Sequence, residues 1–174
     1  MKLDAGPCLL RPWQVGDRQG LVEAANDYEV WRNLAEGFSH PYTVEHADGW
    51  IAHCIEEGEP FRNLAIEVAG EATGAIGLEL PGNERRRTGY VGYWLARRLW
   101  NQGIATAALR AFSQYAFETF DLERLQASVF AWNHPSTRVL EKCGYLLEGR
   151  LRRAIIKDDE VTDELVYGLL RPER

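Results

Sequence analysis

A short turn between a predicted strand and a predicted helix has the composition of an anion-binding site. Gln102-Gly103-Ile104-Ala105-Thr106 follows the apolar segment 93–95 and opens a helix rich in Ala and Leu. The first N–H groups of a helix lack internal partners and lie at the positive end of its dipole, and Gly103 and Ala105 leave room for a ligand near the backbone. A pyrophosphate suits such a turn. Taken alone, the segment still favours an ordinary strand-to-helix turn, because it has neither the glycines nor the lysine of a Walker loop.

A second polar segment, from Asn133 to Tyr145, follows the next predicted strand. It begins with Asn133-His134-Pro135-Ser136, a composition typical of a turn in which Asn133 caps the following helix. Ser136 would then be a small residue near the start of that helix. Both segments therefore lie where a strand ends and a helix begins.

The elements that position these segments mix strands with helices. We predict strands at 8–11, 64–68, 75–80, 89–95 and 125–130, helices at 17–25, 28–34, 44–57, 105–117 and 135–142, and a final hairpin of 145–152 with 161–169. Asp17 is the expected cap of the first helix, and Thr43 and Gly58 bound the third. Leaving out the short helix at 28–34, the elements give the order β-α-α-β-β-β-α-β-α-β-β. Hairpins mixed with helices that cross between strands predict an α+β fold around one sheet.

Composition narrows the classes of function. A chain of 174 residues with 45% hydrophobic and 26% charged residues predicts a single globular domain over residues 1–174. Its net charge of −6 argues against a nucleic-acid partner. No apolar run approaches the ~20 residues of a membrane helix, and the N-terminus lacks the apolar stretch of a signal peptide. We therefore expect no membrane partner and a cytoplasmic location. His46, Asp48, His53 and Cys54 do not all share one helix face, so we predict no metal site.

Together, the two polar segments resemble motifs of the GNAT superfamily of acetyl-CoA-dependent N-acetyltransferases. Within it the chain is similar to the RimJ/RimL-type branch, whose best-known members acetylate the N-termini of ribosomal proteins. The resemblance starts at Leu9-Leu10-Arg11-Pro12-Trp13, includes Gly92-Tyr93-Trp94-Leu95 and ends at Asp163-Glu164-Leu165-Val166-Tyr167. It implies a GNAT-type mixed, mostly antiparallel sheet flanked by helices. It also implies acetyl-CoA as co-substrate and a primary amine as acceptor.

The resemblance assigns coenzyme-binding roles to two groups of residues. The backbone amides of the first group would hold the CoA pyrophosphate: Gln102, Gly103, Ile104, Ala105 and Thr106. The second group, Tyr93, Trp94 and Leu95, would lie along the pantetheine arm, with one backbone N–H aimed at the thioester carbonyl. Trp100 replaces the Gln or Arg that usually opens the motif. Arg97 and Arg98 either pair with the ADP phosphates or are solvated surface charges.

Two catalytic positions follow from the second segment. Asn133 matches the family Asn whose side chain contacts the pantetheine arm, a role compatible with capping. The family Tyr that assists the leaving thiolate is replaced by Leu140, and Ser136 is the hydroxyl that the RimJ/RimL pattern offers instead. Ser136 is equally typical of a small residue at a helix N-terminus.

The general base is less evident. Tyr90 stands where relatives often carry a glutamate. Glu79 is the first remaining candidate and Asp163 the second, and either is also typical of a surface charge. Near pH 7.4, deprotonating a lysine of pKa ~10.4 costs about 4 kcal/mol, whereas an α-amine of pKa ~8 costs under about 1 kcal/mol. A site without an evident base therefore favours an α-amine.

Aromatic residues of the first helices would build the acceptor pocket, although such residues are also typical of a core. The predicted acceptor residues are Trp31, Phe38, His40, Tyr42, Tyr90, Trp132 and Asp163. The leading hypothesis is acetyl transfer by direct attack to the α-amine of a protein or peptide N-terminus. A small amine (polyamine, amino sugar or antibiotic) as acceptor, a non-catalytic acyl-CoA-binding sensor, and a homodimer stay open.

Overall fold

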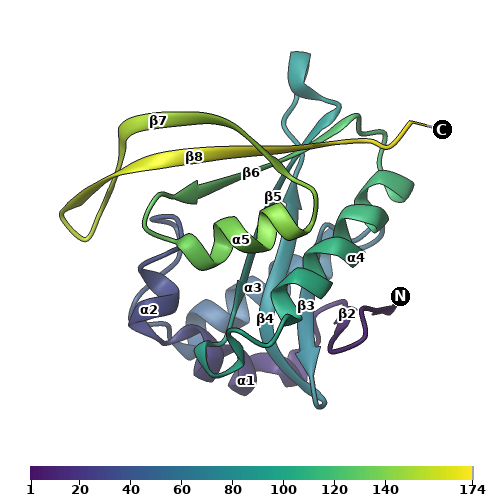
Figure 1. Cartoon of the computed structure of the whole chain (residues 1–174). Helices are drawn as coiled ribbons and strands as arrows, with labels where there is room; N and C mark the ends of the chain where they lie inside the picture. Colours follow the sequence, from purple (N-terminus) through teal and green to yellow (C-terminus); the bar gives the residue numbers. More distant parts are fainter. Residues whose placement is uncertain (174) are drawn as a thin grey trace.

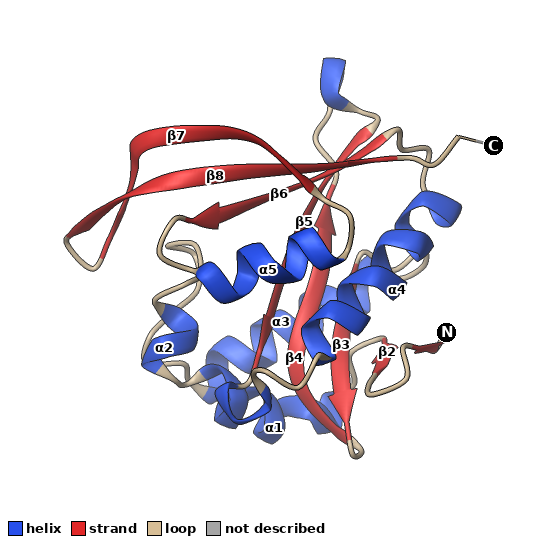
Figure 2. Cartoon of the chain, in the orientation of Figure 1, coloured by secondary structure: helices blue, strands red, loops and turns tan. Residues whose placement is uncertain are grey.

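The computed structural model describes residues 1–173 and contains an eight-stranded sheet (Figures 1 and 2). The strand order is β1-β2-β3-β4-β5-β6-β8-β7, and neighbouring strands are antiparallel except β5 and β6. The strands are β1 (Leu3–Asp4), β2 (Leu9–Arg11), β3 (Asn63–Val68), β4 (Glu71–Glu79), β5 (Thr88–Leu95), β6 (Arg124–Phe130), β7 (Leu146–Lys157) and β8 (Glu160–Leu170). The α-helices are α1 (Arg18–Ala25), α2 (Tyr28–Trp31), α3 (Val44–Glu57), α4 (Ile104–Thr119) and α5 (His134–Lys142). The predicted α+β fold is confirmed.

Helices cover both faces of the sheet, and each face has its own hydrophobic core (Figure 1). On one face α4 and α5 bury Leu109, Phe112 and Leu140 against the strands. On the other face α1 and α3 bury Leu21 and Ile51. The apolar stripe of α4 recurs at residues 104, 108, 112 and 116, which is the i, i+4 spacing that places side chains on one side of a helix. Within residues 1–173, no helix has the length and apolar character that crossing a membrane would require.

The element order differs from the prediction at both ends of the chain. Leu3–Asp4 adds the edge strand β1, whereas the separate helix predicted at 28–34 is confirmed as the shorter α2, Tyr28–Trp31. The final hairpin is longer than predicted because Arg153, with φ of 54°, lies in an irregularity of β7 that interrupts the pairing without ending the strand. The chain turns instead at Asp158 and Asp159, both of which have positive φ.

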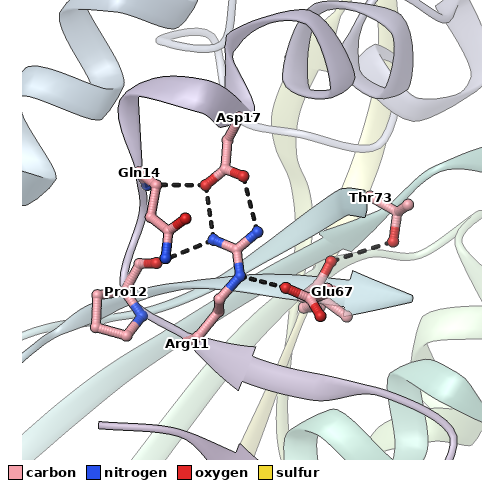
Figure 3. A network of polar contacts seen from close by, with 7 residues as sticks. Arg11, Pro12, Gln14, Asp17, Glu67 and Thr73 are labelled. Atoms are coloured by element: carbon pink, nitrogen blue, oxygen red, sulfur yellow. Dashed lines mark hydrogen bonds and ion pairs between the residues drawn. The ribbon is translucent and has the colours of Figure 1, made fainter. Parts of the chain in front are cut away.

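A buried ion-pair network joins β2 to the start of α1 and to β3 (Figure 3). Arg11 is 4% exposed, and its guanidinium donates to both carboxylate oxygens of Asp17 at 2.7 Å and also to Glu67. Asp17 accepts a further hydrogen bond from the Gln14 N–H at 2.8 Å. The prediction that the Asp17 side chain caps α1 is therefore wrong. The buried Arg11 cation needs that carboxylate, because an unpaired charge in the core is costly.

β5 and β6 pair over three residues and then separate. Residues 88–90 of β5 pair with residues 124–126 of β6. Beyond this point β5 continues along β4 to Leu95, whereas β6 continues along β8 to Phe130. The backbone groups that residues 91–95 direct away from β4 therefore have no neighbouring strand to bind. This separation creates the site described below.

Candidate active site

A cavity of about 910 Å³ lies where β5 and β6 separate. Residues 91–95 of β5 and 127–130 of β6 form two of its walls. The first turns of α4 and α5 line it on one face of the sheet, and α2 with residues 32–35 lines it on the other. The cavity therefore reaches both faces of the sheet, and two molecules can approach it from opposite sides.

The predicted phosphate-binding turn lines this cavity as residues 101–106. Gly103 is the N-cap of α4 with φ of 78°, a left-handed conformation that favours glycine, and no side chain caps the helix. The first backbone hydrogen bond of the helix runs from the Ala107 N–H to the Gly103 carbonyl at 3.0 Å. The N–H groups of residues 104–106 thus remain free for an anion.

Trp100 explains how the turn is held without the usual Gln or Arg. Its indole N–H donates to the carbonyl of Leu95 at 2.7 Å, which ties the turn to the end of β5. The side chain also packs against the core on the α4 face. Trp100 therefore fixes the start of α4 relative to the strand that forms the cavity wall.

The cations beside this turn come from α5. Arg138 and Lys142 line the cavity, whereas Arg97 and Arg98 do not, and Arg98 instead pairs with Glu71 at 3.1 Å. The end of α5 packs on the first turns of α4, because Arg110 donates to the Lys142 carbonyl at 3.0 Å. The sequence carried a signal for the α5 pair, since residues 138 and 142 are four apart and share one helix face.

Tyr93 of β5 and Ser136 of α5 meet in the cavity wall. The Tyr93 hydroxyl lies 2.9 Å from Ser136 Oγ, and it also donates to the Ser136 carbonyl at 3.3 Å. Burial raises the pKa of the Tyr93 phenol, so the phenol stays protonated at neutral pH. The Asn133 side chain accepts from the Ser136 N–H at 3.3 Å, which confirms the predicted cap of α5.

The sequence and the fold both match known acetyltransferases. Residues 8–146 match the acetyltransferase (GNAT) domain. The chain belongs to the GNAT acetyltransferase family. It is 31% identical over 174 residues to the uncharacterized N-acetyltransferase YoaA of Bacillus subtilis, covering 98% of this chain and 97% of that protein. It is 31% identical over 82 residues to the ribosomal-protein-serine acetyltransferase of Escherichia coli, covering 47% of this chain and 46% of that protein.

A solved structure of the same fold extends the comparison to a coenzyme complex. Mycobacterium smegmatis RimJ in complex with CoA-disulfide superimposes with a TM-score of 0.81 at 27% identity, covering 98% of this chain and 86% of that one. The chain is accordingly a GNAT enzyme that uses acetyl-CoA to acetylate an amine. Its own residues fit the coenzyme, because the free N–H groups of α4 and the cations Arg138 and Lys142 suit phosphates. The unpaired edge of β5 suits an extended pantetheine arm.

The residues considered for the general base, Glu79, Tyr90 and Asp163, do not line the cavity. Glu79 and Tyr90 face each other in register where β5 and β6 are still paired, and the Tyr90 hydroxyl accepts from Arg85 at 2.7 Å. The Asp163 carboxylate accepts from the Arg153 N–H at 2.7 Å and from Arg150 at 2.5 Å. These two contacts lower the pKa of Asp163 and stabilise the irregular part of β7. Asp163 is a structural acceptor in this fold, and it does not line the predicted acceptor pocket.

Of the predicted acceptor aromatics, Trp132 lines the cavity, whereas the rings in residues 31–42 pack among themselves and on Trp94 of β5. Trp31 stacks on His40 with ring centroids 5.4 Å apart. Phe38 stacks on the buried Tyr42 at 5.0 Å and meets the edge of Trp94 at 5.5 Å. Trp31, Phe38, His40 and Tyr42 are therefore not lining residues of this cavity, and their role in acceptor binding stays a prediction. These rings pack on each other because large apolar faces gain more from mutual burial than from solvent.

The tip of the β7–β8 hairpin is fastened to α2. Lys157 is 1% exposed, and its Nζ lies 3.8 Å from the centroid of the Trp31 ring without a hydrogen-bond partner in residues 1–173. The Tyr28 hydroxyl donates to Asp158 at 2.6 Å, and Arg32 donates to Glu160 at 2.9 Å. These contacts hold the tip of the β7–β8 hairpin against α2, which lines one side of the cavity.

Two carboxylates that sequence reasoning missed line the cavity on this side. They are Glu29 of α2 and Glu164 of β8. The sequence offered no direct signal for them, because each is one of many charged residues and only the fold brings them together.

Proposed function

We propose that this GNAT enzyme acetylates the α-amine at the N-terminus of a protein or peptide. The observation that carries the proposal is the cavity that passes through the sheet between β5 and β6. The coenzyme-binding features lie on the α4 and α5 side, so the acceptor enters beside α2, where Ala35 and Ser128 are exposed. An extended chain can present its first residue there while the rest stays outside the enzyme.

The chemistry of the amine supports the same class of acceptor. An α-amine of pKa ~8 loses its proton near pH 7.4 at a cost under about 1 kcal/mol, whereas a lysine side chain costs about 4 kcal/mol. The similarity to a ribosomal-protein-serine acetyltransferase also supports a protein N-terminus.

The residues of the chain position both reactants for direct attack. Acetyl-CoA, when bound, supplies the activated acetyl group. The amine nitrogen attacks the thioester carbonyl carbon, so that a C–N bond forms and the C–S bond breaks with its electron pair on sulfur. The nitrogen then carries one proton too many for an amide, and it releases that proton to water. Ser136, hydrogen-bonded to the protonated Tyr93, passes a proton to the thiolate and recovers one from water. A weak acid suffices because a thiol has a pKa of about 8.5, and approximation itself contributes ~7–11 kcal/mol.

Thiol release from acetyl-CoA tests the proposal. The acceptor panel contains peptides with a free N-terminus, the same peptides with a blocked N-terminus and an internal lysine, polyamines, and amino sugars. We expect turnover with the free N-termini and its loss when they are blocked. Turnover confined to polyamines or amino sugars would overturn the proposal and assign a small-amine substrate.

A further inference from the structure

We propose that Glu164 binds the ammonium group of the acceptor and takes the proton that it loses before attack. This inference rests on the proposed function, because it concerns the acceptor side of the same cavity. In the step, one ammonium N–H bond breaks, its electron pair stays on nitrogen, and the proton moves to the Glu164 carboxylate. The neutral amine is then the nucleophile.

The sheet register directs Glu164 toward the acceptor side. Glu164 of β8 pairs with Phe130 of β6, and directly paired residues of antiparallel strands share a face. The alternate residues Ala127, Val129 and Tyr167 are buried in the core under α4 and α5. Glu164 therefore points to the opposite face, where α2 lies, and it lines the cavity there.

Glu164 is the carboxylate on this stretch of β8 that is left without a partner. Its neighbour Asp163 binds Arg150, and Glu160 binds Arg32. Within residues 1–173 the Glu164 carboxylate forms no hydrogen bond or ion pair, and Glu29 accepts one hydrogen bond, from Asn33, at its backbone carbonyl and none at its carboxylate. An unpaired carboxylate in a cavity wall is suited to a cationic ligand.

The cations that line the cavity are distributed so that the side near Glu164 stays suited to a cationic ligand. Arg32, the cation on the α2 side, is held by Glu160 at 2.9 Å and stacks on Trp132 at 4.8 Å. The free cations Arg138 and Lys142 come from α5 on the other face. One side of the cavity thus carries negative charge for an ammonium, and the other carries positive charge for the phosphates of the coenzyme.

Kinetics with amines of different basicity test the role of Glu164. For Glu164→Gln we expect kcat with an N-terminal peptide to fall by about 100-fold or more, within the range of general-base contributions. The KM for acetyl-CoA should stay unchanged. The loss should shrink to a few-fold with an aromatic amine, which is already neutral at the assay pH. Glu164→Asp should recover part of the activity.

Two further variants make the test decisive. Glu118→Gln alters an exposed carboxylate of α4 that bonds only Gln114 within residues 1–173, and it should match the wild type. A loss for Glu164→Gln that is equal for all amines, or a comparable loss in Glu79→Gln instead, would overturn the inference. The proposed function fails separately, because the same variants can be assayed on whichever amine class the wild-type enzyme acetylates.

Discussion

Ser136 is the proton donor to the leaving thiolate in the proposed reaction. We predict that Ser136→Ala lowers kcat by about tenfold with little change in the KM for acetyl-CoA. The effect should be smaller than the usual range for general acids, because a thiolate of pKa about 8.5 is already a fair leaving group. Steady-state thiol release measures both constants.

Thr137 supplies the matched control for this variant. Its hydroxyl donates to the His134 carbonyl at 2.8 Å, and the residue lies outside the cavity. Thr137→Ala should therefore leave kcat unchanged. An unaltered kcat in Ser136→Ala would show that water protonates the thiolate and that Ser136 only packs at the start of α5.

The Arg11 network makes a prediction about stability. Asp17→Ala removes two hydrogen bonds of 2.7 Å from the guanidinium of Arg11, a residue that is 4% exposed. We expect the free energy of unfolding to fall by about 3–5 kcal/mol, since the buried cation loses its main partner. Urea unfolding measures the change.

The neighbouring residue shows what an exposed ion pair contributes. Arg18 pairs with Asp48 at 2.6 Å, and both side chains are about half exposed. Arg18→Ala should cost only about 0–1 kcal/mol. Similar losses in the two variants would contradict the assignment of Arg11 and Asp17 as a buried structural pair.

Individual residues were predictable where function depends on neighbours in the chain. The turn around Gly103 and the cap Asn133 follow from local composition, and both lie where the sequence places them. Glu164 and Arg138 depend on strand register and helix packing, which bring distant segments together. Glu79 does not line the cavity, because it lies beside Tyr90, where β5 and β6 are still paired.

The N-terminus of α4 is the element on which coenzyme binding depends most. We predict that Gly103→Glu weakens acetyl-CoA binding by at least 100-fold. The substitution strains a residue with φ of 78° and places a negative charge beside the expected phosphates. Isothermal titration calorimetry gives the dissociation constant directly.

A glycine on another helix controls for the added charge. Gly49 lies on the exposed side of α3, with open space around its position. Gly49→Glu should bind acetyl-CoA like the wild type. Unchanged binding in Gly103→Glu would mean that the phosphates lie elsewhere.

Elements were predictable where their ends carry clear chemical signals. Thr43 and Gly58 bound α3, as predicted. The final hairpin was underestimated because Arg153 adopts a left-handed φ inside a strand, a conformation set by the contact of its N–H with Asp163. The contact between Lys157 and Trp31 could not be foreseen, because residues 126 positions apart meet only in the folded chain.

At the scale of the whole molecule, the sheet divides into two parts where β5 and β6 separate. β1 to β5 form one part and β6, β8 and β7 form the other, and three residue pairs between β5 and β6 join them. The mixed fold was predictable from alternating elements. The junction was not, because β5 and β6 each continue as regular strands beyond it, and a pattern within one strand does not report where its neighbour departs.

Binding of acetyl-CoA to the folded chain predicts a stabilising effect of the coenzyme. At 100 times its dissociation constant, acetyl-CoA should stabilise the fold by about 2.7 kcal/mol. For a chain of this size the melting temperature should rise by about 5–10 °C. Differential scanning calorimetry checks the shift. Gly103→Glu, with at least 100-fold weaker binding, should shift by no more than about 1–2 °C at the same concentration, and a shift equal to that of the wild type would contradict coenzyme binding at α4.

Because the edge of β5 is unpaired, hydrogen exchange can show directly whether a ligand is bound along this strand. Amide hydrogens that residues 91–95 direct toward the gap have no strand acceptor, so they should exchange rapidly with deuterated solvent. A pantetheine arm that binds as an added strand would protect those amides, while amides directed toward β4 would change little. Hydrogen exchange would then rank different acyl-CoA molecules by fit along β5 without an acceptor and without turnover.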